Sequence, residues 1–263
     1  MKINMICAAI TALSIAISSK ANAGLVLFAN DVTGGDSSIA EVLSADGHNV
    51  TSLIGGFDSG INSDLTGNLS SFDAVFWSAS GSSSGNLHEQ EQFSSLISYV
   101  FNGGNVFVTG YDSIASPGDP WLIDFVGGGS SVDLPGTNLT ALTGANDLTK
   151  GLFDIEGSIP TGAGSDRDGL NDLTVETSCL SFSDNSSCQW SLRNHGLGQI
   201  AYVSAGHNAV GIDSAWTQQG GSYNAAIRNF AYNASGPVEV PEPSTIAILA
   251  FGLFGLVSRR HKK

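Results

Sequence analysis

Aspartate, serine and histidine side chains follow the ends of several predicted strands and could together support hydrolysis. Asp112 and Ser113 come soon after an apolar run at 105–109, and His207 follows another at 199–204. A carboxylate, a hydroxyl and an imidazole are the groups from which a hydrolytic site is built. A turn-capping role for Ser113 and a structural or ligand-binding role for His207 are the simpler interpretations.

Further polar side chains stand at the ends of the same predicted strands. In a doubly wound sheet, the loops at the carboxyl ends of the parallel strands converge on one crevice, where ligands usually bind. We therefore expect a ligand crevice that is lined by Asn30, Asp31, Ser78, Ser80, Tyr111, Asp112, His207 and Asn208.

A separate concentration of acidic side chains lies at 166–172. Asp166, Asp168 and Asp172 alternate around a glycine, and several carboxylate oxygens within reach of one ion suit Ca²⁺. An EF-hand needs a later glutamate, and Glu176 comes too early for that. A solvated aspartate-rich turn is the favoured interpretation, so no cofactor is expected, and Ca²⁺ is the metal ion that this segment could hold.

Apolar runs and helical periodicity predict the elements that position these side chains. Continuous apolar runs of strand length occur at 24–30, 48–54, 72–79, 105–109 and 199–204, and helical patterns occur at 36–46, 88–102 and 222–232. Their alternation with short connectors predicts an α/β fold with a doubly wound, flavodoxin-like and mostly parallel sheet.

One stretch interrupts this alternation. Residues 127–190 are rich in Gly, Ser, Thr and Asp and contain only short strand-like pieces. They predict an irregular, β-rich insertion within a single domain at 24–234.

The first 23 residues predict a secretory signal peptide. Lys2 gives a basic start, an apolar stretch follows at 5–17, and Ala21-Asn22-Ala23 is a small-x-small cleavage site. We expect export by the Sec route and cleavage by signal peptidase after Ala23, which leaves Gly24 as the mature N-terminus.

Two cysteines remain once the leader and its Cys7 are removed. Cys179 and Cys188 are nine residues apart in a polar stretch. An even pair in an exported chain predicts a disulfide, here one that closes a polar loop. A metal-binding pair is the weaker alternative, because no histidine lies near with zinc-finger spacing.

The C-terminal segment combines three features after a linker at 235–239. Pro241-Glu242-Pro243 predicts an extended, protease-accessible stretch, and an apolar helix is predicted at 245–258. Arg259 and Arg260 begin a basic end that should stay cytoplasmic. The apolar stretch is short for a permanent transmembrane helix, which indicates a transient inner-membrane intermediate.

The order of these features at 240–263 resembles the PEP-CTERM sorting signal, which exosortase reads in Gram-negative bacteria with extracellular polysaccharide. The resemblance implies that exosortase cuts the tail near the Pro-Glu-Pro triplet. It also implies that the product is released or attached at the cell surface, with exopolysaccharide or a biofilm matrix as its surroundings.

The charge of the exported part excludes one class of partner. Residues 24–258 hold all 24 acidic residues against four basic ones, a net charge of −20. Such a surface repels phosphate backbones, so nucleic-acid binding is not expected.

Two segments resemble class I glutamine amidotransferase-like domains. Residues 99–112 (Tyr-Val-Phe-Asn-Gly-Gly-Asn-Val-Phe-Val-Thr-Gly-Tyr-Asp) look like the helix, double glycine, strand and sharp turn of that class. Residues 198–207 (Gly-Gln-Ile-Ala-Tyr-Val-Ser-Ala-Gly-His) are similar to the late strand and Gly-His of its trehalose-utilisation (ThuA-like) branch. The resemblance covers most of residues 24–234.

The resemblance implies a nucleophilic cysteine at the turn after the fourth strand, but Gly110-Tyr111-Asp112-Ser113 contains none. Glutamine hydrolysis by the family mechanism is therefore excluded. We expect an exported surface protein with a non-catalytic domain that binds a small ligand or glycan. The alternatives are a secreted hydrolase or carbohydrate-modifying enzyme that uses the strand-end crevice, and a purely structural surface or biofilm protein.

Overall fold

The structure is a computed structural model that describes residues 23–31, 37–54, 69–79, 94–110, 114, 119–134, 138–161, 167–184, 186–204 and 214–236. Asn22–Gly236 form one compact unit. Most of the leader and the whole sorting segment lie outside the described residues. Within the described ranges, no helix is long and apolar enough to cross a membrane. The predicted helix at 245–258 lies outside those ranges and stays a prediction.

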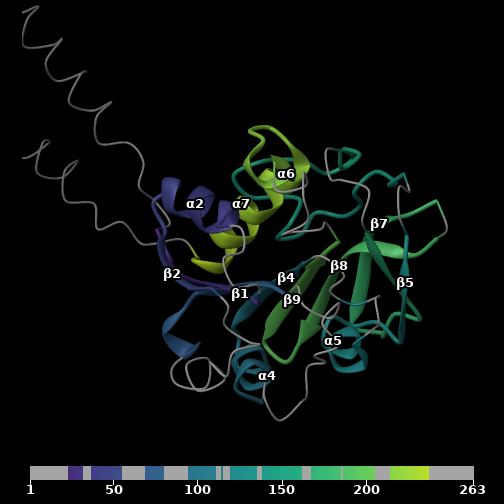
Figure 1. Cartoon of the computed structure of the whole chain (residues 1–263), viewed down its shortest axis with the longest axis horizontal. Coiled ribbons are helices and arrows are strands. Elements are labelled where there is room, and N and C mark those ends of the chain that lie inside the picture. The colour runs from purple at the N-terminus through teal and green to yellow at the C-terminus, as the bar shows by residue number, and fades with distance from the viewer. Residues whose placement is uncertain are drawn as a thin grey trace, which may run out of the picture. The chain divides into compact units, whose positions relative to one another are not determined.

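A mixed sheet of nine strands organises the described part of the chain (Figure 1). Its order is β2-β1-β3-β4-β9-β8-β6-β5, and β7 pairs with β8 off this path. The first five strands in this order are parallel, namely β1 (Leu25–Asn30), β2 (Asn49–Ile54), β3 (Ala74–Ser78), β4 (Asn105–Thr109) and β9 (Gly198–Val203). This is the flavodoxin-like order, so the predicted doubly wound fold is confirmed.

The rest of the sheet is antiparallel. It consists of β5 (Ser130–Asp133), β6 (Asp168–Asn171), β7 (Thr177–Phe182) and β8 (Cys188–His195). The β8 strand pairs with β9 from Trp190 to His195, beyond the predicted end of the insertion. The segment predicted as an insertion therefore extends the main sheet.

Helices cover both faces of the parallel strands (Figure 1). On one face lie α2 (Ser38–Ala45), α6 (Ser214–Thr217) and α7 (Ser222–Ala234), and on the other lie α4 (Ser94–Phe101) and α5 (Pro120–Phe125). A short 3-10 helix, η1 (Leu69–Ser71), precedes β3. Side chains along a strand point alternately to the two faces of the sheet. The rings of Phe107 and Phe230 of α7 therefore pack together, with centroids 5.7 Å apart, whereas the neighbouring Val106 belongs to the core beneath α4. The first part of the helix predicted at 88–102 lies outside the described residues.

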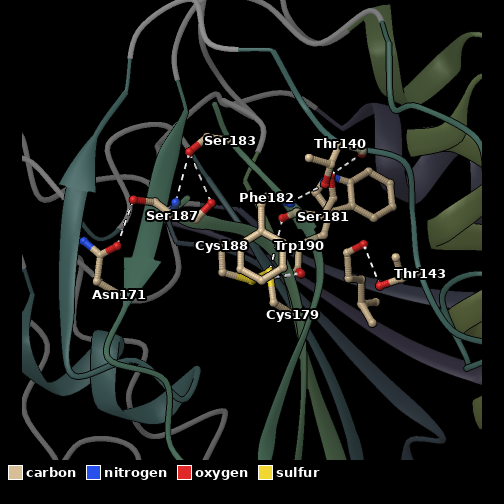
Figure 2. The surroundings of a disulfide bond; sticks show 11 residues. Thr140, Thr143, Asn171, Cys179, Ser181, Phe182, Ser183, Ser187, Cys188 and Trp190 are labelled. Atoms are coloured by element: carbon tan, nitrogen blue, oxygen red, sulfur yellow. Dashed lines mark hydrogen bonds between the residues drawn. A yellow bond between two sulfur atoms is a disulfide. The ribbon is translucent and has the colours of Figure 1, made fainter. Parts of the chain in front are cut away.

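The predicted disulfide is present and joins two neighbouring strands (Figure 2). Cys179 of β7 and Cys188 of β8 have Cα atoms 5.6 Å apart. The strand register shifts between them, on either side of Ser181, whose hydroxyl donates to the carbonyl of Thr140 at 2.7 Å. The bond thus fastens a β-bulge in the sheet, as well as closing the polar loop that the sequence predicted.

Candidate functional site

The carboxyl ends of β1 and β3 form the topological switch point of the sheet. The chain runs from β1 to β2 on one side and later returns to β3 on the other. Ligands of doubly wound folds bind at such a point. Asn30 lies opposite Ser78 in the ladder, and the amide nitrogen of Asp31 donates to the carbonyl of Ser78 at 3.1 Å. The structure therefore brings together three of the predicted crevice residues.

A row of polar side chains crosses three parallel strands at this edge. Asn30 pairs with Ser78, and Ser78 pairs with Thr109 of β4. All three are fully buried. Each stands two positions after a core phenylalanine, so the row lies on the face that α2 and α7 cover. Thr109 was not among the predicted crevice residues, because only the register between β3 and β4 places it beside Ser78.

Asp31 is the buried acid of the switch point. Its side chain is 4% exposed, and Oδ1 accepts a hydrogen bond of 2.9 Å from Nε1 of Trp77. Because Trp77 belongs to the core under α4 and α5, this bond fixes the Asp31 carboxylate on the face opposite the polar row.

A second buried acid, Asp168, holds the chain at Ile114. Its Oδ2 accepts from the amide nitrogen of Ile114 at 3.1 Å, and the carbonyl of Ile114 accepts from Ser131 Oγ at 2.8 Å. The amide nitrogen of Asp168 donates to Ser204 Oγ at 2.7 Å, at the carboxyl end of β9. Asp168 therefore links β6 and β9 to the chain at Ile114.

This position corrects the interpretation of 166–172 as a turn. Asp168 begins strand β6, and Asp172 follows its end, where Oδ2 accepts from Ser130 Oγ at 2.9 Å. Four residues of extended chain separate the two by about 13 Å, too far for one Ca²⁺ ion. Asp166 lies outside the described residues. In the described ranges, no three His, Cys, Asp or Glu side chains are grouped to hold a metal ion.

The remaining predicted crevice and catalytic residues lie outside the described residues. They are Ser80, Tyr111, Asp112, Ser113, His207 and Asn208. One candidate nucleophile motif was not predicted. Gly81-Ser82-Ser83-Ser84-Gly85 has Gly-x-Ser-x-Gly spacing and follows β3. Its position between a strand and a helical pattern was the signal that could have found it. It also lies outside the described ranges.

A hollow of about 560 Å³ lies at the opposite, amino-terminal edge of the sheet. Asp73 precedes β3 there, Gly104 precedes β4, and Ser98 and Tyr99 of α4 complete the lining with Asn102. The hydroxyl of Tyr99 donates to the carbonyl of Phe72 at 3.0 Å, and burial raises the pKa of this phenol, so it stays neutral. Ligands of doubly wound folds usually bind at the carboxyl edge, so this hollow and the predicted crevice lie at opposite ends of the parallel strands.

Comparison with known structures defines the class of fold. A cytoplasmic protein from Salmonella typhimurium LT2 has a TM-score of 0.54 and 13% identity, over 80% of this chain and 97% of that one. A ThuA-like protein from Parabacteroides merdae also has a TM-score of 0.54 and 13% identity, over 81% and 90% of the two chains. The domain thus has the fold of ThuA-like, amidotransferase-like proteins.

The same fold occurs inside a longer enzyme. A β-galactosidase from Rahnella sp. R3 has a TM-score of 0.51 and 14% identity, over 88% of this chain and 34% of the enzyme. No curated protein sequence matches the chain.

The C-terminal tail belongs to a recognised class of sorting signal. Residues 239–263 match the PEP-CTERM protein-sorting motif. This motif is a signal for export to the cell surface in Gram-negative bacteria, which confirms the resemblance seen in the sequence.

Proposed function

We propose that this is an exosortase-processed protein of the envelope or extracellular matrix, whose ThuA-like domain binds a small neutral ligand or glycan without catalysis. The match of residues 239–263 to the PEP-CTERM motif is the observation that carries the sorting part. Signal peptidase would remove the leader, and exosortase would then cut near Pro241-Glu242-Pro243.

The state of the cysteines supports a non-catalytic domain. Cys179 and Cys188 are the only cysteines after the leader, and the disulfide consumes both. The thiolate is the nucleophile of the family mechanism, and an oxidised sulfur cannot supply it. The two buried acids at the carboxyl edge also have structural uses, since Asp31 accepts from Trp77 and Asp168 holds Ile114.

Charge and side-chain chemistry favour a neutral, hydroxyl-rich ligand. A net charge of −20 over residues 24–258 opposes anionic ligands. Amide and hydroxyl groups both donate and accept, as sugar hydroxyls require, and Asn30, Ser78 and Thr109 gather such groups at the switch point. All three are fully buried, so a ligand would reach them only if it displaced the chain that covers them.

Replacement of the Pro241-Glu242-Pro243 triplet by alanines should abolish sorting. In a host that contains exosortase, the wild-type protein is expected at the surface or in the medium without its tail. The variant is expected to stay in the inner membrane with the tail attached. Fractionation and intact-mass measurement separate these outcomes, and wild-type protein that keeps its tail at the surface would contradict exosortase processing.

Thr109→Val should weaken ligand binding by roughly tenfold, because it replaces a buried hydroxyl beside the switch point by a methyl group that cannot hydrogen-bond to the ligand. Isothermal titration of the exported protein with neutral exopolysaccharide fragments measures this. The matched control is Thr143→Val in the loop at 138–161. It removes a hydroxyl that donates to the carbonyl of Leu180 in β7, away from the switch point.

Equal binding by both variants would show that the switch point is not the binding site. The same titration mixtures also test the alternative function. Cleaved fragments would favour a hydrolase that uses Asp112, Ser113 and His207 over a binding domain.

A further inference from the structure

We propose that removal of the signal peptide creates a structural group of the mature protein, the α-ammonium group of Gly24, which binds in a seat formed by Asp73, His48 and Ser235. The proposal rests on the predicted cleavage after Ala23. It is independent of sorting by the tail and of any ligand.

The new terminus is already placed at a boundary between solvent and protein. Ala23 is exposed, whereas Gly24 is buried at the start of β1. The nitrogen of Gly24 donates to Nδ1 of His48 at 3.1 Å. The carbonyl of Gly24 accepts from the amide nitrogen of Asn49, which follows His48, at 2.9 Å. Cleavage at this bond would therefore leave the amino group bound and not at the end of a loose segment.

The seat has no room for a side chain at position 24. A Cβ atom there would lie 2.0 Å from Ser235 Oγ and 2.7 Å from Asp73 Oδ2. The nitrogen is bonded to the same Cα atom, so it lies no more than about 5 Å from the Asp73 carboxylate. Asp73 is further held by Leu25, whose amide nitrogen donates to Oδ2 at 2.8 Å. Glycine is the residue that allows this close approach.

The charges around the seat favour an added cation. Asp46 is already neutralised by Arg228, whose Nε and Nη2 donate to its two carboxylate oxygens at 2.5 and 2.6 Å. Among the described residues, no cation is paired with Asp73. An ammonium group at Gly24 would supply that counter-charge, and it would carry two more donors than the peptide nitrogen it replaces.

The state of His48 fits its use as an acceptor. Burial lowers the pKa of His48 from 6.5, although Asp46 and Asp73 oppose this shift. The imidazole is therefore neutral at physiological pH, and a neutral ring can accept at Nδ1 when its proton is on Nε2. The pKa of His48 is lower in the folded than in the unfolded protein. The stabilisation by the neutral imidazole is therefore complete above pH 6.5 and is lost as the pH falls below 6.5.

The test measures how fast the α-amino group reacts. The full chain is produced with its own leader, extracted in mild detergent, and treated with acetic anhydride at neutral pH. Mass spectrometry should identify Gly24 as the N-terminus. Acetylation of its amino group should be at least about tenfold slower in the folded than in the urea-unfolded protein, because only the uncharged amine reacts and one pKa unit is a factor of ten.

Two variants make the result specific. Asp73→Asn keeps the shape of the seat but removes its charge, so acetylation of Gly24 should accelerate at least threefold while circular dichroism is unchanged. Asp154→Asn is the matched control, because Asp154 is 67% exposed and pairs with Lys150. It should accelerate acetylation of Lys150 and leave Gly24 unchanged.

Three outcomes would overturn the proposal. They are an N-terminus other than Gly24, acetylation of Gly24 within threefold of the unfolded rate, and protection of Gly24 that survives Asp73→Asn. None of them bears on sorting, which the Pro-Glu-Pro variant tests separately.

Discussion

Asn229→Ala is expected to lower the free energy of unfolding by about 3 kcal/mol, because a single buried amide holds the loop at 138–161 on helix α7. Oδ1 of Asn229 accepts from the amide nitrogen of Phe153 at 2.8 Å. Its Nδ2 donates to the carbonyls of Leu148 and Phe153, both at 3.0 Å. Alanine would leave all three backbone groups without this partner, and each buried group left unsatisfied costs about 1–3 kcal/mol.

Urea unfolding followed by tryptophan fluorescence measures this loss, since Trp190 and Trp216 are both fully buried in the core. Limited proteolysis should also cut the variant within 138–161 faster than the wild type. Asn233→Ala is the matched control. The Nδ2 of Asn233 donates to the carbonyls of Asp147 and Lys150, but its surroundings are only partly buried, so about 1 kcal/mol is expected. Equal losses from the two variants would mean that burial of Asn229 is not the cause.

Loss of the Cys179–Cys188 bond should lower the free energy of unfolding by about 2–3 kcal/mol. This is the entropic cost of closing a loop of roughly ten residues in the unfolded chain. The double variant Cys179→Ala with Cys188→Ala and the reduced wild type should both show this loss in urea unfolding. Alanine suits position 188 because Cys188 is almost fully buried, where a serine hydroxyl would need a new partner.

Ser178→Ala, on the exposed side of β7, is the control and should change the free energy of unfolding by less than about 0.5 kcal/mol. If the reduced and oxidised proteins unfold at the same urea concentration, the bond does not stabilise the domain.

The parallel half of the sheet could be predicted from local sequence, and the antiparallel half could not. Leu25–Asn30 and Ala74–Ser78 are continuous apolar runs because helices cover both faces of these strands. Cys188–His195 mixes apolar, polar and charged residues, so no apolar run marks it as a strand. It forms local hairpins with β7 and β9, whereas its single pairing with β6 joins Leu170 to Cys188 across the β7 strand. That last contact depends on the fold and is not encoded by a short pattern.

Helix α5 was missed although its start carries a local signal. Asp119 caps it, with Oδ1 accepting from the amide nitrogen of Leu122 at 3.0 Å, and Pro120 is its first residue. Asp168 was assigned to a turn because its local sequence carries a misleading signal. Its neighbours Gly169 and Asp172 look like a turn, and the pairing of this segment with β5 and with Cys188 of β8 shows that it is a strand.

The candidate site was predicted in part. Asn30, Asp31 and Ser78 could be placed together because the carboxyl ends of parallel strands share one edge. Thr109 needed the register of β4, and the link from Asp168 to Ile114 spans 54 residues. Contacts of that separation follow from the fold and leave no mark in the local sequence.

Gly24 and Ser235, near the two ends of the compact unit Asn22–Gly236, are neighbours in space. A domain that begins and ends at one point can exchange whatever is attached there without rearranging its interior. The predicted leader and the sorting segment could then be replaced during evolution without changing the domain. The same domain could be directed to another location by changing only its terminal segments.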